Sequence, residues 1–267
     1  MRGKREELLL IVSFLLILVG SVAAADAAQI SIQAREVEID RLKGLVIARG
    51  GVRVTDGKVT ITSQEMTLDQ NRRRATFKGQ VHVVRSSEEL TAEVVTIVLD
   101  AKNTVQQVTA SNGATVTTKE FLLSASEIHA TLATETLRAT ESVRLLLPPD
   151  VLATAERLTF IRKTQEALLE GKPRVQSKDG YLTAERITIW LQAQKALASG
   201  SVKGEFAGTK FSAAEAKVDH KSKTAFLHGN VEIHRSSQQL HASVVTLYYG
   251  ERRMVAEGEV RIRASGE

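Results

Sequence analysis

The sequence predicts an all-β protein whose repeated antiparallel sheet is creased, so that two sheets meet at an edge. Three observations support this fold class: eight repeats of about 29 residues, apolar residues alternating with a period of two, and Asp-Gly turns between the alternating segments. The chain has 267 residues, of which 43% are hydrophobic and 25% charged. That composition suffices for a sizeable core and excludes both a disordered tail and a multi-span membrane protein. Aromatic residues make up only 4%, so we expect an aliphatic interior.

The first 25 residues have the three parts of a secretory signal peptide: a basic start (Arg2, Lys4, Arg5), an apolar run (Leu8–Val19) and small residues at a cleavage site (Ala23–Ala25). A retained inner-membrane anchor is the alternative, because the apolar stretch approaches the roughly 20 residues of a spanning helix. In both cases the remainder is exported. We therefore expect residues 1–25 to be a signal or anchor and residues 26–267 to form one β-domain.

One pattern occurs eight times, with a small residue between apolar positions. The small residues are Ala34, Ser63, Ala92, Ala125, Ala155, Ala184, Ala213 and Ala242. In six copies a glycine follows 16 residues later, namely Gly50, Gly79, Gly171, Gly200, Gly229 and Gly258. The third copy instead has an insertion around Ser111–Gly113, and the fourth has Glu141 in place of the glycine. The middle of the repeat array is therefore its irregular part.

The two arms of each repeat differ in their alternation. Apolar residues keep one phase around the glycine, as in Phe77 and Val81, whereas the phase slips by one residue between Ser63 and Met66. Such a slip would turn a flat strand's apolar side chains outwards unless the strand bends at a bulge. We therefore predict a crease at every small residue, with the glycine of the partner arm at the same crease.

The connections favour antiparallel pairing over the rival architecture, a parallel β-helix. Asp-Gly pairs lie between alternating segments within Thr55–Lys58 and Lys178–Tyr181, which is typical of β-hairpins. Neither end of the array has an atypical capping repeat, so both terminal strands present edges that another strand could join. Alternatively, Arg261 and Arg263 blunt the last edge.

The repeated pattern A-x-x-Φ-x-Φ-D…A-x-G-x-V-x-V, where Φ is apolar, resembles that of the OstA-like family. The best-matching stretches are Ser63–Val83, Ala213–Ile233 and Ala242–Ile262, and the resemblance covers essentially all of residues 26–267. It implies a V-shaped β-jellyroll without catalytic residues or cofactor. The resemblance further implies that the inner surface shelters the acyl chains of lipopolysaccharide, and that members join edge to edge into a periplasmic bridge between the membranes.

The inward phase of the alternation defines a candidate aliphatic groove. Its predicted lining residues are Val52, Val54, Met66, Leu68, Phe77, Val81, Val83, Val95, Ile97, Ile187, Ile189, Val202, Val218, Leu227, Val231, Ile233, Val245, Leu247, Val260 and Ile262. Acyl chains need an apolar lining without specific hydrogen bonds, and these side chains provide one. The same residues would equally form the closed core of a β-sandwich, and the residues alone leave both interpretations open.

Other chemistry has weaker support in the sequence. The six histidines lack a metal-ligand spacing, and Asp40, Asp69, Asp100 and Asp219 are best explained as turn-forming residues rather than calcium ligands. The basic run Arg72–Arg74 is interpreted as a solvated turn, with contact to a lipid phosphate as the alternative. No nucleophile elbow, phosphate loop or dinucleotide fingerprint occurs, and the net charge of +5 is too small to suggest nucleic-acid binding.

The sequence thus predicts a non-enzymatic periplasmic carrier of lipopolysaccharide that uses no cofactor or metal. Its expected partners are other lipopolysaccharide-transport jellyroll proteins at the inner and outer membranes, together with further copies of itself stacked head to tail. Three alternatives remain: an inner-membrane-anchored component of the same machine, a structural β-repeat protein that polymerises, and a glycan-active β-helix enzyme. The enzyme would need paired carboxylates in a cleft, which the sequence does not locate.

Overall fold

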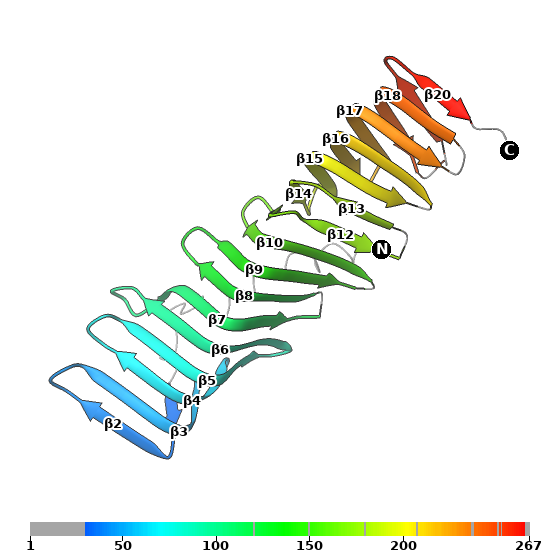
Figure 1. The fold of residues 1–267 in the computed structure, drawn as a ribbon. Helices are drawn as coiled ribbons and strands as arrows, with labels where there is room; N and C mark the ends of the chain where they lie inside the picture. Colours follow the sequence, from blue (N-terminus) through cyan, green and yellow to red (C-terminus); the bar gives the residue numbers. More distant parts are fainter. Residues whose placement is uncertain are drawn as a thin grey trace, which may run out of the picture. The chain divides into compact units, whose positions relative to one another are not determined.

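The computed structural model describes residues 30–264 except 120, 149, 179, 207, 236–237, 250 and 252. The predicted signal or anchor at residues 1–25 lies outside this part. The described residues form 20 β-strands and no helix, and so contain no helical segment able to cross a membrane (Figure 1). The predicted all-β class is confirmed.

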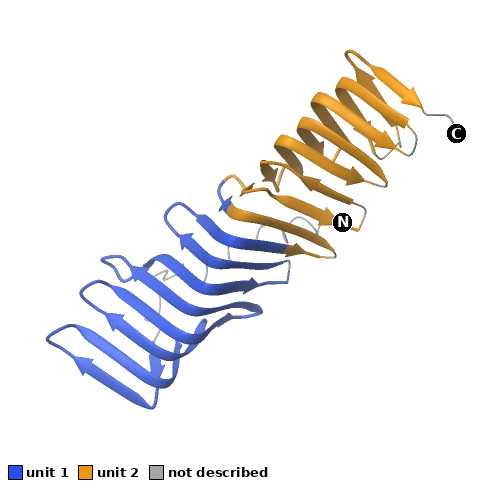
Figure 2. Ribbon diagram, viewed as in Figure 1, with its two compact units in different colours: residues 1–145, 159–163 blue, residues 146–158, 164–267 orange. Residues whose placement is uncertain are grey.

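The chain divides into two compact units, unit 1 with residues 1–145 and 159–163 and unit 2 with residues 146–158 and 164–267 (Figure 2). Unit 1 contains β1 (Ser31–Gln33), β2 (Glu36–Asp40), β3 (Leu45–Thr55), β4 (Thr60–Asp69), β5 (Arg74–Arg85), β6 (Glu88–Leu99), β7 (Val105–Thr117) and β8 (Leu122–Thr131). The division falls within β9 (Thr136–Leu147) and β10 (Val151–Ile161). Unit 2 contains β11 (Glu166–Glu170), β12 (Arg174–Ser177), β13 (Gly180–Thr183), β14 (Arg186–Trp190), β15 (Lys195–Phe206), β16 (Thr209–Asp219), β17 (Thr224–Arg235), β18 (Gln238–Tyr248), β19 (Arg253–Glu257) and β20 (Arg261–Ala264).

Strands that follow one another from β3 to β8, and from β15 to β18, pair antiparallel. Both Asp-Gly segments form hairpins, as predicted. In the first, Thr55 pairs with Thr60, and the Asp56 carboxylate accepts hydrogen bonds from the backbone N–H groups of Lys58 and Val59 at 2.8 and 2.7 Å. In the second, Ser177 pairs with Gly180. This antiparallel topology excludes the alternative of a parallel β-helix.

A crease interrupts the strand register at each predicted position that the pairing covers. Between β4 and β5, Thr62 pairs with His82 and the next pair is Glu65 with Lys78, so the shift encloses Ser63. The extra residue lies on the glycine-bearing strand rather than on the strand of the small residue, since Gly79 and Gln80 together span the gap between the pairs Lys78–Val94 and Val81–Ala92. A bulge of two residues against one bends the strand while keeping its apolar side chains inward.

Two consecutive residues with positive φ form the crease in all eight repeats, a regularity that the sequence did not predict. The pairs are Gly50–Gly51, Gly79–Gln80, Asn112–Gly113, Glu141–Ser142, Gly171–Lys172, Gly200–Ser201, Gly229–Asn230 and Gly258–Glu259. The two irregular repeats keep the same backbone, because Asn112 and Gly113 have φ of 63° and 87° and Glu141 and Ser142 have 61° and 56°. The crease is therefore kept where the glycine pattern is broken, although non-glycine residues there adopt a strained backbone conformation with positive φ.

The creases divide each strand ladder into two half-sheets. In unit 1 the first half-sheet contains residues 36–40, 45–49, 65–69, 74–78, 94–99, 105–111 and 127–131, and the second contains residues 31–33, 52–55, 60–63, 81–85, 88–92, 114–117 and 122–125. The inward residues of both half-sheets supply the core. Among the described residues, the only buried polar side chains are Ser63 and Thr188, and the Ser63 hydroxyl donates to the Glu65 carbonyl at 2.9 Å.

Candidate functional site

The inner face of the first half-sheet begins with a fully buried row beside the crease. In unit 1 this row is Ala48, Met66, Phe77, Val95, Ala110 and Ile128, and each member pairs with the next across the ladder. None is more than 2% exposed. Directly opposed apolar side chains stabilise neighbouring strands, so this row holds the folded sheet together.

A second inward row, closer to the turns, remains partly open to solvent. In unit 1 the half-buried members are Val46, Leu68, Ala75 and Ile97, which also pair in succession. The equivalent row of unit 2 is Ile189, Ala196, Val218, Ala225 and Leu247, followed by Met254, which is 44% exposed. This half-exposed aliphatic row provides apolar surface that an additional molecule could cover.

The predicted lining residues fall into three groups in the structure. Twelve are buried: Val52, Met66, Phe77, Val81, Val83, Val95, Ile187, Val202, Leu227, Val231, Ile233 and Val245. Six are half-buried: Val54, Leu68, Ile97, Ile189, Val218 and Leu247. Val260 and Ile262 are 44% and 68% exposed. The alternation identified the inward face, but it did not separate side chains that pack the crease from those that solvent still reaches.

The prediction omitted several members of the half-exposed row. Ala75, Ala196 and Ala225 lie opposite Leu68, Val218 and Leu247 respectively. All three alanines have the inward phase, which is the signal that identifies them.

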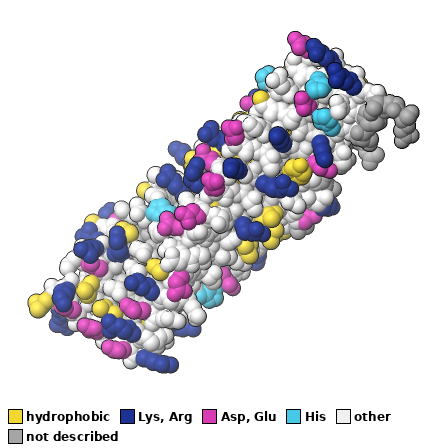
Figure 3. Space-filling model, viewed as in Figure 1, with side chains coloured by type: hydrophobic (Ala, Val, Ile, Leu, Met, Phe, Trp, Pro, Cys, Tyr) yellow, Lys and Arg dark blue, Asp and Glu magenta, His cyan; other side chains and the backbone are white. Residues whose placement is uncertain are grey.

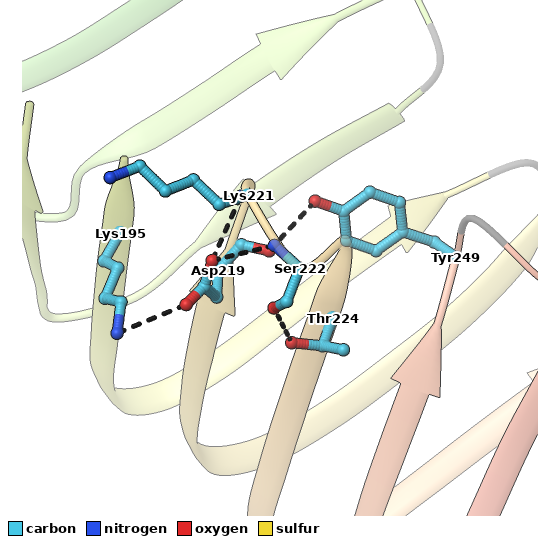
Figure 4. Close-up of polar contacts among 6 residues, drawn as sticks. All are labelled: Lys195, Asp219, Lys221, Ser222, Thr224 and Tyr249. Atoms are coloured by element: carbon cyan, nitrogen blue, oxygen red, sulfur yellow. Dashed lines mark hydrogen bonds and ion pairs between the residues drawn. The ribbon is translucent and has the colours of Figure 1, made fainter. Parts of the chain in front are cut away.

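The recurring aspartates form turns, as the sequence predicted. Asp40, Asp69 and Asp219 accept backbone hydrogen bonds from residues three positions later at 2.9–3.1 Å. The Asp100 carboxylate accepts hydrogen bonds from the backbone N–H groups of Lys102 and Thr104. The pKa of Asp219 lies below its ordinary value, chiefly because the Ser222 N–H donates to the carboxylate, with a further contribution from Lys195 at 3.2 Å (Figure 4). Donors directed at a carboxylate favour its charged form.

Tyr249 belongs to the same polar cluster. Its hydroxyl donates to the backbone carbonyl oxygen of Asp219 at 3.4 Å, and partial burial raises its pKa, with the nearby Asp219 charge adding to the effect. Backbone hydrogen bonds also connect successive turns: Gln70 N–H donates to the Gly44 carbonyl, Leu99 to Arg73, His220 to Gln194 and Tyr249 to Lys223, at 2.9–3.1 Å. The turns are thereby fixed in a regular series within each unit.

Four of the histidines make local contacts with neighbouring side chains. His82 lies 3.3 Å from Glu89, and His234 and His241 both approach Glu232, at 3.7 and 3.6 Å. His228 stacks against Phe226 with ring centroids 6.4 Å apart. In the part of the chain that the structure describes, no three potential ligand side chains gather into a metal-binding group.

The first and last described strands expose apolar residues of the inward phase. In unit 1, Ile32, Val37 and Ile39 are 39%, 49% and 63% exposed. In unit 2, β20 pairs with residues 238–241 of β18, and no second partner strand for β20 occurs among the described residues. These strands therefore present apolar side chains that their own unit leaves uncovered.

Comparison with known proteins gives one family match. Comparison with functionally curated proteins finds no match. Among solved structures, the crystal structure of LptH from Pseudomonas aeruginosa, described as the LptA-homologous periplasmic component of the lipopolysaccharide transport device, matches with 16% identity and a TM-score of 0.31 over 54% of this chain and 82% of that chain. A family model described as "LptA/(LptD N-terminal domain) LPS transport protein" matches residues 60–195 and 210–267. Because these residues make up more than half of the chain, the protein belongs to the LptA/LptD N-terminal domain family of lipopolysaccharide transport proteins.

Proposed function

We propose that the protein is a periplasmic carrier that holds the acyl chains of lipopolysaccharide on its half-exposed aliphatic row and forms a segment of a bridge between the two membranes. Family membership supports the transport role. The proposed binding surface is the row defined by Leu68 and Ile97 in unit 1 and by Val218 and Leu247 in unit 2.

The half-exposed row is the observation that carries this proposal. A residue such as Phe77, at 2% exposure, already has its apolar surface covered by the protein, so a ligand gains little from it without moving the sheet. Leu68 and Ile97 still contact water, and covering them with an acyl chain would release that water. Aliphatic side chains of this kind favour lipid tails without selecting one tail length.

The uncovered terminal strands support the bridging part of the proposal. Exposed strand edges with apolar side chains on one face are suited to pairing with a further strand. Arg261 and Arg263 alternate with Ile262 in β20, so their charges lie on the face opposite the isoleucine. The charges can therefore face water while the inward side chain is covered by a partner strand.

Site-specific photocrosslinking tests the binding surface. A photoreactive amino acid at Leu247 or Leu68 should yield a lipopolysaccharide adduct in cells, whereas the same residue at Lys217 or Thr76, which have the outward phase, should not. Adducts of equal yield from both faces, or none from either, would contradict the carrier proposal and favour a structural β-repeat protein. Fractionation addresses the anchored alternative, in which the protein stays in the inner membrane with residues 1–25 intact.

A further inference from the structure

One edge of unit 1 brings cationic side chains next to the half-exposed aliphatic row. We define the first margin of unit 1 as residues 40–44, 69–74, 100–104 and 131–136, which are the turns of the first half-sheet with their flanking residues. The second margin is defined as residues 55–60, 85–89, 117–119 and 121–122, at the turns of the second half-sheet. Figure 3 shows Lys and Arg side chains gathered along the left of unit 1, where the turns of the first margin lie.

The two margins differ in net charge. The first contains six cations, Arg41, Lys43, Arg72, Arg73, Arg74 and Lys102, against the four anions Asp40, Asp69, Asp100 and Glu135, for a net charge of +2. The described residues of the second contain three cations, Lys58, Arg85 and Lys119, against the three anions Asp56, Glu88 and Glu89, for a net charge of 0. An anionic group near the aliphatic row is therefore attracted more strongly to the first margin than to the second.

The carboxylates of the first margin are largely occupied by the turns themselves. Asp69 accepts from the Arg72 N–H at 2.9 Å, and Asp40 accepts from the Lys43 N–H at 3.0 Å and pairs with its ammonium group at 3.1 Å. By contrast, the exposed side chains of Arg41, Arg73 and Arg74 form no ion pair with any described residue. Three guanidinium groups thus remain available for an external anion.

Hydrogen bonds place the turns that carry these arginines beside one another. The Gln70 N–H donates to the Gly44 carbonyl at 2.9 Å, and the Asn71 side-chain amide donates to the Lys43 carbonyl at 2.8 Å. The turn that carries Arg41 is therefore fixed against the turn that carries Arg73. Guanidinium groups bind phosphate through paired N–H donors, so adjacent arginines suit a phosphate better than a single ammonium group does.

The spacing between the arginines and the apolar row fits an amphiphile. Arg74 is the neighbour of Ala75 along β5, and Leu68 lies opposite Ala75 across the ladder. At about 3.3 Å per residue along a strand, a cationic group follows the aliphatic row within one or two residues. We infer that the first margin of unit 1 binds the phosphate groups of the lipid head, an inference that rests on the proposed carrier function. Lipopolysaccharide then lies with its head at this margin and its acyl chains on the adjacent row.

Matched charge removal tests this inference. The purified full-length protein is titrated with bisphosphorylated lipid A and with the same lipid after enzymatic removal of its phosphates. The variant Arg73→Gln/Arg74→Gln removes two charges from the first margin, and Lys58→Gln/Lys119→Gln removes two exposed charges from the second. We expect the first variant to bind bisphosphorylated lipid A about tenfold more weakly than the unmodified protein, and the second variant to bind it unchanged.

Two further measurements make the test specific. Arg41→Gln alone should weaken binding about threefold, which provides a result should the double variant fail to fold. All variants should bind phosphate-free lipid A as the unmodified protein does. The assignment of the first margin would be overturned if the variants of the two margins lost equal affinity, if neither lost affinity, or if affinity fell equally for both lipids. The carrier function would remain intact in each of these cases. Failure of the unmodified protein to bind either lipid would instead overturn the carrier function itself.

Discussion

Gly229 lies against Ala214 so closely that a Cβ atom added to the glycine would approach the Ala214 Cβ to 2.7 Å. Gly229 also has a φ of 82° and is the first residue of a crease pair. The glycine is thus required both for its backbone conformation and for the approach of the neighbouring strand.

The substitution Gly229→Ala should destabilise unit 2 by about 2–3 kcal/mol, since it adds a contact between two Cβ atoms to the cost of a left-handed residue. Thermal unfolding followed by circular dichroism measures the effect. Gly113→Ala is the matched control, because Gly113 has a φ of 87° but nothing lies within 4 Å of its added Cβ. If the two variants lost equal stability, the close approach to Ala214 would contribute nothing to the effect of the Gly229 substitution.

The substitution Glu141→Gly should stabilise the protein by about 1 kcal/mol, because it removes the cost of a left-handed glutamate. Glu141 has a φ of 61° at the position that six repeats fill with glycine. Denaturant unfolding gives the change in midpoint. As a control, Glu127→Gly lies within β8, outside the crease pairs, and should destabilise. A lower midpoint for Glu141→Gly would mean that the glutamate side chain has a stabilising role.

Leu227 and Leu247 should separate folding from lipid binding. Leu227→Ala removes a side chain that is 1% exposed and should cost about 3 kcal/mol of stability. Leu247→Ala truncates a half-buried member of the aliphatic row, so it should cost less stability and weaken lipid A binding instead. Unfolding curves and lipid titrations of both variants test this, and the expectation fails if the two leucines affect the same property.

Asp219 should make the protein less stable in acid. Its folded pKa is lowered, chiefly by the Ser222 N–H and then by Lys195, so its contribution is present above the unfolded value near 3.8 and is lost as the pH falls through the lower folded value. Asp219→Asn should therefore lower the melting temperature at pH 6 and have a smaller effect at pH 2. Glu127→Gln, which removes an exposed carboxylate within a strand, is the control variant. An equal deficit at both pH values would exclude a role for the charge.

Periodicity predicted much of this fold from the sequence because a strand's side chains alternate and a crease changes their phase. The slip between Ser63 and Met66 predicted the register shift that lies between Thr62 and Glu65. The phase slip did not show which of the two paired strands carries the extra residue of the bulge. A second left-handed residue such as Gln80 has no compositional signal, since any L-residue can adopt that conformation when the surrounding ladder compensates the strain.

The candidate site was predicted in outline only. Inward phase identified Phe77 and Leu68 alike, yet one is buried and the other half-buried. The neighbouring strands decide exposure as well, since Val108 pairs with the half-buried Ile97 and is itself only 2% exposed, and alternation contains no information on such packing. The turns that carry Arg41 and Arg73 are likewise joined by hydrogen bonds between residues 26 and 28 positions apart in the sequence, which no local pattern specifies.

The paired left-handed residues have a consequence for how such chains change over time. Each copy contains its own bend, and its neighbours along the chain supply the ladder contacts around it. One repeat of about 29 residues can therefore be duplicated or deleted, and only the two adjoining repeats need to accommodate the change. Evolution can adjust the number of repeats, and with it the area of the half-exposed aliphatic row, without redesigning any single repeat.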